Sequence, residues 1–136
     1  MKGIEPILYQ HKEVACIYRK NLPVKGIRFL TTPDNFFQIG IHDRKDKIKL
    51  PPHTHNCPKP LTVNAIQELL YVIRGKIRVT LVSEDQKLIA EKLLSAGDAV
   101  LFISEGHGVE FLGNARVFEI KQGPYPGAEN AKHYLA

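Results

Sequence analysis

Three histidines and one glutamate are the residues of this chain whose types and spacing are best suited to chemistry. His53 and His55 stand one residue apart. Glu68 opens a hydrophobic run, and His107 lies between two glycines. Imidazole nitrogens and carboxylate oxygens are the donors that hold zinc, iron, manganese or nickel in proteins. Because such a set is enough for a mononuclear site, we expect one divalent transition metal bound by all four residues.

The local sequence around each residue supports this expectation. In an extended strand, residues i and i+2 point to the same face, so His53 and His55 project together as two ligands of one ion must. The carboxylate of Glu68, placed at the start of an apolar strand, is costly to bury unless it is paired or bound to a cation. The two glycines beside His107 leave room for a ligand to approach closely.

Each residue also has an ordinary structural interpretation. His53 and His55 alone would be a solvated surface pair, and Glu68 alone an exposed residue that begins a strand. His107 alone would be a polar residue in a glycine-rich turn. The occurrence of all four in order along one chain is what favours the metal site.

The elements that must position these residues are mostly strands. Apolar and polar residues alternate over several short stretches, and turn signals rich in glycine, asparagine and aspartate separate them. Many short strands with regular turns predict an all-β sandwich or barrel. Little helix is expected, with one short candidate at 128–135. The strands with the clearest patterns are 36–42, 68–73, 76–82, 87–94, 99–103 and 115–121.

Composition limits the class of protein. The chain has 136 residues, a formal net charge of +5 and 43% hydrophobic residues, which fits one globular domain. No apolar run approaches the length of a membrane-spanning helix, and the N-terminus lacks the pattern of a signal peptide. We therefore expect a cytoplasmic protein, in which Cys16 and Cys57 do not form a disulfide. The basic residues are scattered without interleaved aromatic residues, so no nucleic acid partner is expected.

Two motifs resemble those of the cupin superfamily. The first combines His53-Thr54-His55 with Glu68 and, after six further residues, Gly75. The second begins with Gly97-Asp98, continues through a short apolar strand and ends at His107. The resemblance covers about half of the chain, from Lys49 to Lys121, and implies a double-stranded β-helix, or jelly-roll barrel.

The resemblance also implies a domain organisation. We expect a single cupin domain over residues 1–136, with N-terminal strands in 1–48, the motif-bearing barrel in 49–121 and a C-terminal tail in 122–136. Twelve residues, Asn56–Gln67, separate the two parts of the first motif. We expect them to bulge out as a loop, because lengthening a surface loop costs little free energy. A weaker resemblance connects the chain to small cupins associated with bacterial sugar and polysaccharide chemistry.

Several functions are compatible with this resemblance. The first is a metal-dependent enzyme acting on a small polar substrate, a sugar or an acid, by isomerase-type or dioxygenase-type chemistry. The alternative is a non-catalytic module that binds or senses a small ligand, and a third possibility is a barrel whose metal site is empty. A second titratable side chain beside the metal favours the enzyme, whereas a purely apolar lining favours binding. The catalytic base remains unassigned among His42, Tyr71, Glu110 and Glu119, and no organic cofactor is expected.

Small cupins often pair through edge strands. By analogy, we expect a homodimer in which the N-terminal segment Val24–Thr31 contributes a strand. The expected partners are therefore a second copy of the chain and a small molecule, with no membrane.

Overall fold

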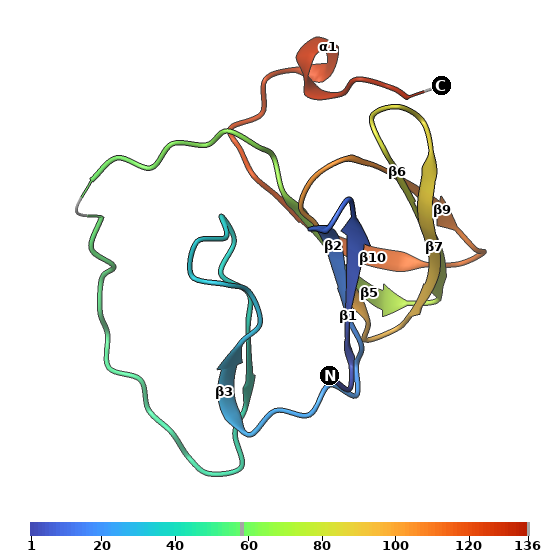
Figure 1. Ribbon diagram of the computed structural model, residues 1–136. Coiled ribbons are helices and arrows are strands. Elements are labelled where there is room, and N and C mark those ends of the chain that lie inside the picture. Colours follow the sequence, from blue (N-terminus) through green and yellow to red (C-terminus); the bar gives the residue numbers. More distant parts are fainter. Residues whose placement is uncertain (58, 136) are drawn as a thin grey trace. The chain divides into compact units, whose positions relative to one another are not determined.

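The computed structural model describes residues 1–57 and 59–135, so Pro58, in the loop expected between His55 and Glu68, lies outside the described residues. The chain divides into two compact units. Unit 1 comprises Met1–Leu22 and Ala65–Ala136, and unit 2 comprises Pro23–Asn64. Unit 2 contains β3 (Gly26–Phe29) and β4 (Gly40–Asp43). The elements of unit 1 (Figure 1) are β1 (Ile4–Tyr9), β2 (Lys12–Tyr18), β5 (Glu68–Arg74), β6 (Lys76–Val82), β7 (Leu88–Ser95), β8 (Ala99–Phe102), β9 (Gly106–Phe111), β10 (Arg116–Lys121) and α1 (Ala128–Ala131).

Unit 1 is built from two antiparallel sheets with one hydrophobic core. The first sheet has the strand order β1-β2-β8-β5-β10, and the second has the order β7-β6-β9. Buried residues of both sheets form a single cluster, as in a β-sandwich. The expected all-β class is therefore confirmed. The core residues are Ile7, Val14, Ala15, Ile17, Leu70, Val72, Ile77, Val79, Leu81, Leu94, Val100 and Phe102.

The expected closure into a barrel is not observed. Within residues 1–57 and 59–135, neither sheet of unit 1 closes on itself: β1 and β10 form the edges of one, and β7 and β9 those of the other. The chain instead passes between the two open sheets at successive turns. β5 pairs with β8 and β10 in the first sheet, while β6 pairs with β7 and β9 in the second.

The alternating sequence of β6 explains why it lies at the centre of the three-stranded sheet. Ile77, Val79 and Leu81 are fully buried, whereas the residues between them are partly exposed. Successive side chains of a strand point to opposite faces, so one face packs in the core and the other contacts water. The β6 strand has the bounds predicted from the sequence.

Gly75 joins β5 to β6 in a conformation that only glycine adopts at low cost. Its φ is +78°, and a Cβ at this position would lie 2.5 Å from the carbonyl oxygen of Asn114. Gly113 provides a matched comparison, because its φ is +85° but a Cβ there would have no neighbouring atom within 4 Å among the described residues. Both substitutions to alanine carry the left-handed backbone penalty, and only Gly75→Ala adds a steric clash.

We therefore predict a larger loss of stability for Gly75→Ala than for Gly113→Ala. The free energy of unfolding should fall by about 1 kcal/mol for Gly113→Ala and by at least about 2 kcal/mol for Gly75→Ala. Urea unfolding followed by circular dichroism measures both values. Equal losses would contradict the close approach of Asn114 to the turn.

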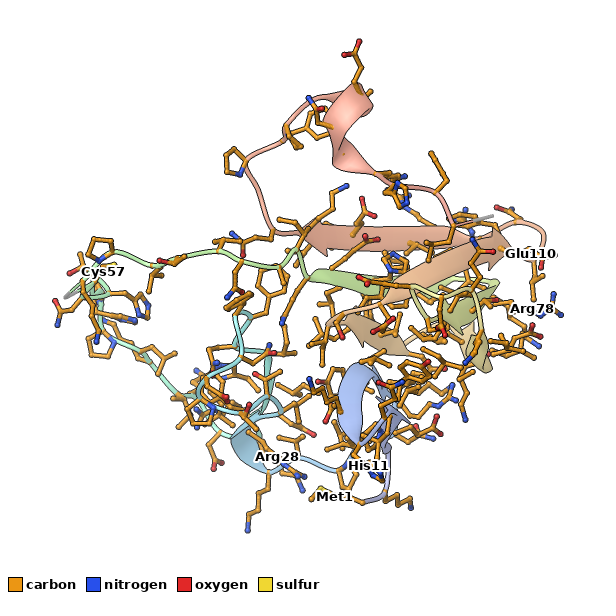
Figure 2. All side chains as sticks on the ribbon, turned by 45° about the horizontal axis from the view of Figure 1, so that its top comes forward. Met1, His11, Arg28, Cys57, Arg78 and Glu110 are labelled. Carbon is orange, nitrogen blue, oxygen red and sulfur yellow. The ribbon has the colours of Figure 1, made fainter. Side chains whose placement is uncertain are left out.

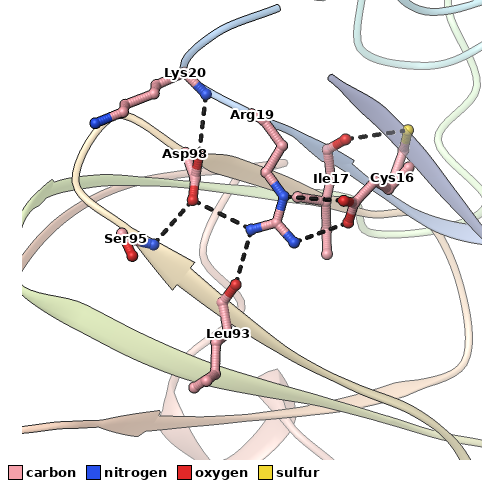
Figure 3. A network of polar contacts seen from close by, with 8 residues as sticks. Cys16, Ile17, Arg19, Lys20, Leu93, Ser95 and Asp98 are labelled. Atoms are coloured by element: carbon pink, nitrogen blue, oxygen red, sulfur yellow. Dashed lines mark hydrogen bonds and ion pairs between the residues drawn. The ribbon is translucent and has the colours of Figure 1, made fainter. Parts of the chain in front are cut away.

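Asp98, from the second motif, has a structural function in the turn between β7 and β8. It is 7% exposed and accepts hydrogen bonds from the backbone N–H groups of Ser95 and Lys20. The guanidinium of Arg19 donates to Asp98 and forms an ion pair with Glu5 on β1 (Figure 3). Asp98 therefore ties this turn to β1 and to the end of β2.

Unit 2 contains one two-stranded antiparallel sheet. Ile27 of β3 lies opposite His42 of β4, and Phe29 lies opposite Gly40. The strand expected over 36–42 thus begins later, at Gly40. The residues before it form a turn, in which the side-chain amide of Gln38 donates to the carbonyl oxygens of Thr32 and Asn35. Across the described parts of both units, no helix is long and apolar enough to cross a membrane.

Candidate functional site

Glu68 lies at the end of the sandwich, on the face of the first sheet that points toward the core. It is in phase with Leu70 and Val72, which are both buried core residues. Its neighbours across the sheet are Phe102 on β8 and Lys121 on β10. The side chain of Glu68 is only 15% exposed. A carboxylate held in this position needs a charged or hydrogen-bonding partner.

His107 provides that partner from the opposite sheet. It is paired with Leu81 of β6 and therefore shares the core-facing side of the second sheet. Its ring is stacked on Phe102 with a centroid distance of 3.8 Å and an interplanar angle of 2°. The Nε2 atom of His107 lies 3.4 Å from Oε2 of Glu68. Phe102 thus fixes the plane of the imidazole while Glu68 meets its edge.

A second carboxyl group, that of Glu119, lies beside this pair. Glu119 is on β10, where it lies opposite Leu70, so its side chain is on the same face of the sheet as that of Glu68. The two carboxyl groups shift each other's pKa. The side chain of Glu119 reaches solvent, so this end of the sandwich is accessible. Glu68, His107 and Glu119 thus form one acid–base cluster assembled from three strands.

The surroundings of this cluster shift the pKa values of its two carboxyl groups in opposite directions. Burial acts to raise the pKa of Glu68, but hydrogen bonds with His107 and Glu119 outweigh burial and hold that pKa below its usual value. The hydrogen bond with Glu68 raises the pKa of Glu119, and partial burial and the negative charge of Glu68 add to the effect. Glu119 therefore holds a proton more readily than Glu68 does.

His53 and His55 are neighbours within unit 2. Their ring centroids are 5.0 Å apart with an interplanar angle of 67°. The Nδ1 atom of His53 lies 2.9 Å from the carbonyl oxygen of Pro51. Because a carbonyl oxygen only accepts, Nδ1 carries the proton, and the lone pair of Nε2 points elsewhere. Such a backbone hydrogen bond is the usual means of fixing the tautomer of a metal-binding histidine.

The structure therefore assembles the four expected ligands as two pairs. Glu68 and His107 meet in unit 1, and His53 and His55 are adjacent in unit 2. Among residues 1–57 and 59–135, no group of three or more His, Cys, Asp or Glu side chains has the arrangement of a metal site. Each pair offers donors of the types that transition metals prefer, so each fits two positions of a coordination shell.

The other candidates for a catalytic base lie elsewhere. Tyr71 is on the opposite face of β5 from Glu68 and is 44% exposed. Glu110 forms an ion pair with Arg78, at 2.8 Å, on the solvent-facing side of the three-stranded sheet (Figure 2). His42 is an exposed residue of β4 in unit 2. Of the three candidates in unit 1, Glu119 is the one whose position on β10 places it on the same sheet face as Glu68.

The two cysteines differ strongly in environment. Cys16 is 2% exposed on β2, and burial, assisted by the charge of Glu13, raises the pKa of its thiol to about 11. Cys57 is exposed on the extended segment of unit 2, where its Sγ donates to the carbonyl oxygen of Lys59 (Figure 2). Both are free thiols.

We predict that Cys57 alone reacts with a thiol reagent in the native protein. The thiolate is the reactive form, and burial denies Cys16 both the reagent and ionisation near neutral pH. A colorimetric thiol assay should count one fast-reacting group per native chain and two after denaturation, and Cys57→Ser should remove the fast phase. Fast reaction of both thiols in the native protein would contradict the burial of Cys16.

The sequence alone did not identify two features of this site. The first is Phe102, which has the sequence pattern of an ordinary core residue in an apolar strand. The second is Lys132 in the C-terminal tail, whose positive charge opposes the rise in the pKa of Glu119. Glu119 itself carries a usable signal, because it alternates with the partly buried Val117 and therefore shares the core-facing side of β10.

Comparison with known proteins gives no relative for this chain. No protein family, no curated protein and no solved structure matches it.

Proposed function

We propose that this protein is a metal-dependent enzyme with a cupin-type fold, acting on a small polar substrate by isomerase-type proton transfer. The observation that carries the proposal is the cluster of Glu68, His107 and Glu119 at one accessible end of the sandwich. It combines two metal donors with a carboxyl group that need not bind the metal.

The strand pairing supports the cupin-type, jelly-roll arrangement. β5 and β6 pair with β8 and β7 respectively, so one long antiparallel ribbon continues through both sheets. β10 and β9 extend the ribbon in the same way, because they pair with β5 and β6. Two sheets connected by such ribbons are the basis of a double-stranded β-helix.

The residues fit a divalent cation. Glu68 and His107 would hold it together with His53 and His55, and zinc, iron, manganese or nickel would suit these donors. A bound cation would act as a Lewis acid that polarises an oxygen of the substrate. Glu68 would bind in its ionised form, which its contact with His107 already favours.

Glu119 is the residue that favours an enzyme over a non-catalytic binding module. Its carboxyl oxygens lie beside the proposed metal ligands and reach solvent, so they can take a proton from a bound substrate and return it. A pocket lined only by valine, leucine and phenylalanine would instead have favoured a non-catalytic binding module. Because proton transfer needs such a group and oxygen activation does not, Glu119 favours the isomerase over the dioxygenase.

Elemental analysis of protein purified without added metal tests the proposal. We expect about one first-row transition metal per chain. After removal by a chelator, metal should rebind, and His107→Gln should weaken rebinding at least tenfold, as loss of a direct ligand requires. His133→Gln is the matched control and should bind as the unsubstituted protein does. A chain that binds no transition metal under any of these conditions would refute the proposal.

We also propose that the active form is a cytoplasmic homodimer. The segment expected to contribute a strand, Val24–Thr31, contains β3, which pairs with β4 along one edge. An unpaired strand edge is available to a second copy of a chain. Size-exclusion chromatography with light scattering should give twice the mass of one chain, and a monomer at micromolar concentration would contradict this assignment.

A further inference from the structure

Phe102 occupies a closely defined position between two strands of the first sheet. It is the last residue of β8, is 2% exposed and belongs to the hydrophobic core. It lies opposite Ala15 of β2 on one side and opposite Glu68 of β5 on the other. Residues directly opposite each other in antiparallel strands place their side chains on the same face, so Phe102 and Glu68 are neighbours on the core-facing side. Close packing in the core restricts the ring of Phe102 to one orientation.

His107 meets this ring from the other sheet. The centroids of the two rings are 3.8 Å apart and their planes differ by 2°, so the rings stack face to face. The Nε2 atom of His107 lies 3.4 Å from Oε2 of Glu68. Both chain neighbours of His107, Gly106 and Gly108, lack a side chain that could support the imidazole. The orientation of the imidazole therefore depends on Phe102 at its face and Glu68 at its edge.

The face-to-face arrangement favours an imidazole that carries positive charge. Two neutral aromatic rings prefer an offset or edge-to-face arrangement, with centroids roughly 4.5 to 7 Å apart, because their negative faces repel each other. The rings of Phe102 and His107 are closer than that and parallel. A positive charge above a phenyl ring is instead attracted by the negative face. Because an imidazole that binds a cation takes on part of its charge, the stack becomes more stable when His107 is a ligand.

Burial sets the size of this attraction. A cation–π contact changes an equilibrium about two- to fivefold at exposed sites and more than about tenfold when water is excluded. Phe102 is 2% exposed, and the side chain of His107 is 28% exposed. The stack therefore lies between the two limits, and we expect an effect of about five- to tenfold on the binding of a cation by His107.

We propose that Phe102 is a positioning residue for His107. Its ring holds the imidazole in the plane in which Nε2 faces Glu68, and its negative face stabilises the positive charge that the imidazole takes on when it binds a cation. The inference rests on the proposed function, because that cation is the metal of the proposed site. It makes a core residue with no metal-binding atom a determinant of metal affinity.

Nuclear magnetic resonance of chelator-treated protein tests the positioning without a metal. A phenyl ring stacked on an imidazole shifts the carbon-bound protons of the imidazole upfield, so Phe102→Leu should move the ring signals of His107 downfield. Val100→Ala is the matched control, because Val100 is a fully buried core residue of the same strand. It should leave these signals in place. Signals of His107 that do not respond to Phe102→Leu would overturn the proposal.

Metal affinity, measured by competition with a chromogenic chelator, tests the effect of charge. Phe102→Leu removes the aromatic face, and pentafluorophenylalanine at position 102 keeps the ring but reverses the charge of its face. Both changes should weaken binding about five- to tenfold, whereas Val100→Ala should change it by less than about twofold. Unchanged affinity with the fluorinated ring would contradict the stabilisation of charge by Phe102.

A double variant establishes that Phe102 acts through His107. In a His107→Gln background, Phe102→Leu should weaken binding no further, because the imidazole that it positions is absent. A further loss equal to that in the unsubstituted protein would mean that Phe102 acts only through the stability of the core, and would overturn the proposal.

The two measurements also separate this inference from the proposed function. A chain that binds no transition metal in any form would refute the proposed function and the effect of charge together, and the ring signals of His107 would still decide the positioning. Normal metal binding that is insensitive to Phe102 would refute this inference alone.

Discussion

The double variant His53→Ala/His55→Ala should lose its metal. We expect metal content to fall from about one per chain to less than about a tenth, with affinity weakened at least a hundredfold, because two of four donors are removed. Both rings are exposed, so stability of the metal-free protein should change by less than about 0.5 kcal/mol. Elemental analysis after desalting, with competition against a chromogenic chelator, measures both content and affinity.

A matched variant separates metal ligation from a general loss of histidine. His42→Ala/His133→Ala removes two other histidines, one from each unit, and should keep its full metal content. Circular dichroism and thermal unfolding of both variants establish that they fold. Unchanged metal content in His53→Ala/His55→Ala would show that the ion is held elsewhere.

The second large effect concerns the core beneath the site. Leu81 is fully buried between the sheets and lies opposite His107 in the pairing of β6 with β9. We predict that Leu81→Ala lowers the free energy of unfolding by about 3 to 4 kcal/mol, since it forfeits buried apolar surface and leaves a cavity. Leu88→Ala, on β7, is the control: Leu88 is 66% exposed and its loss should cost under about 1 kcal/mol.

Chemical denaturation with matched fluorescence and circular dichroism transitions gives these values. The contrast between Leu81 and Leu88 tests the sandwich itself, because it depends on which strand residues face the opposite sheet. Similar losses for the two variants would mean that β6 does not present Leu81 to a shared core.

Alternation and glycine turns are the parts of this fold that the sequence predicts well. β6 has the expected bounds because Ile77, Val79 and Leu81 alternate strictly with polar residues and Gly75 begins a turn. The strand β9 is not predicted by the sequence, because the glycines around His107 favour a turn. It is extended here since β6 supplies the hydrogen-bonding partner, with Gly108 paired to Thr80. Such pairing between distant residues outweighs local propensity.

The candidate site is likewise predicted only in part by the sequence. The motifs predict that Glu68 and His107 lie together, and their contact at 3.4 Å depends only on motif residues at strand ends. Glu119 is one of four equal candidates until the register of β10 places it beside Glu68. Lys132 has no sequence signal, because its position depends on how the C-terminal tail packs against Gly106. The joining of His53 and His55 to the same ion stays a prediction.

That joining is the central claim, and anomalous diffraction from zinc-loaded crystals tests it most directly. We predict a single strong peak at about 2.0 to 2.2 Å from a nitrogen of each of His53, His55 and His107 and from an oxygen of Glu68. A peak bound by one pair alone, with the other pair remote from it, would contradict the proposed site.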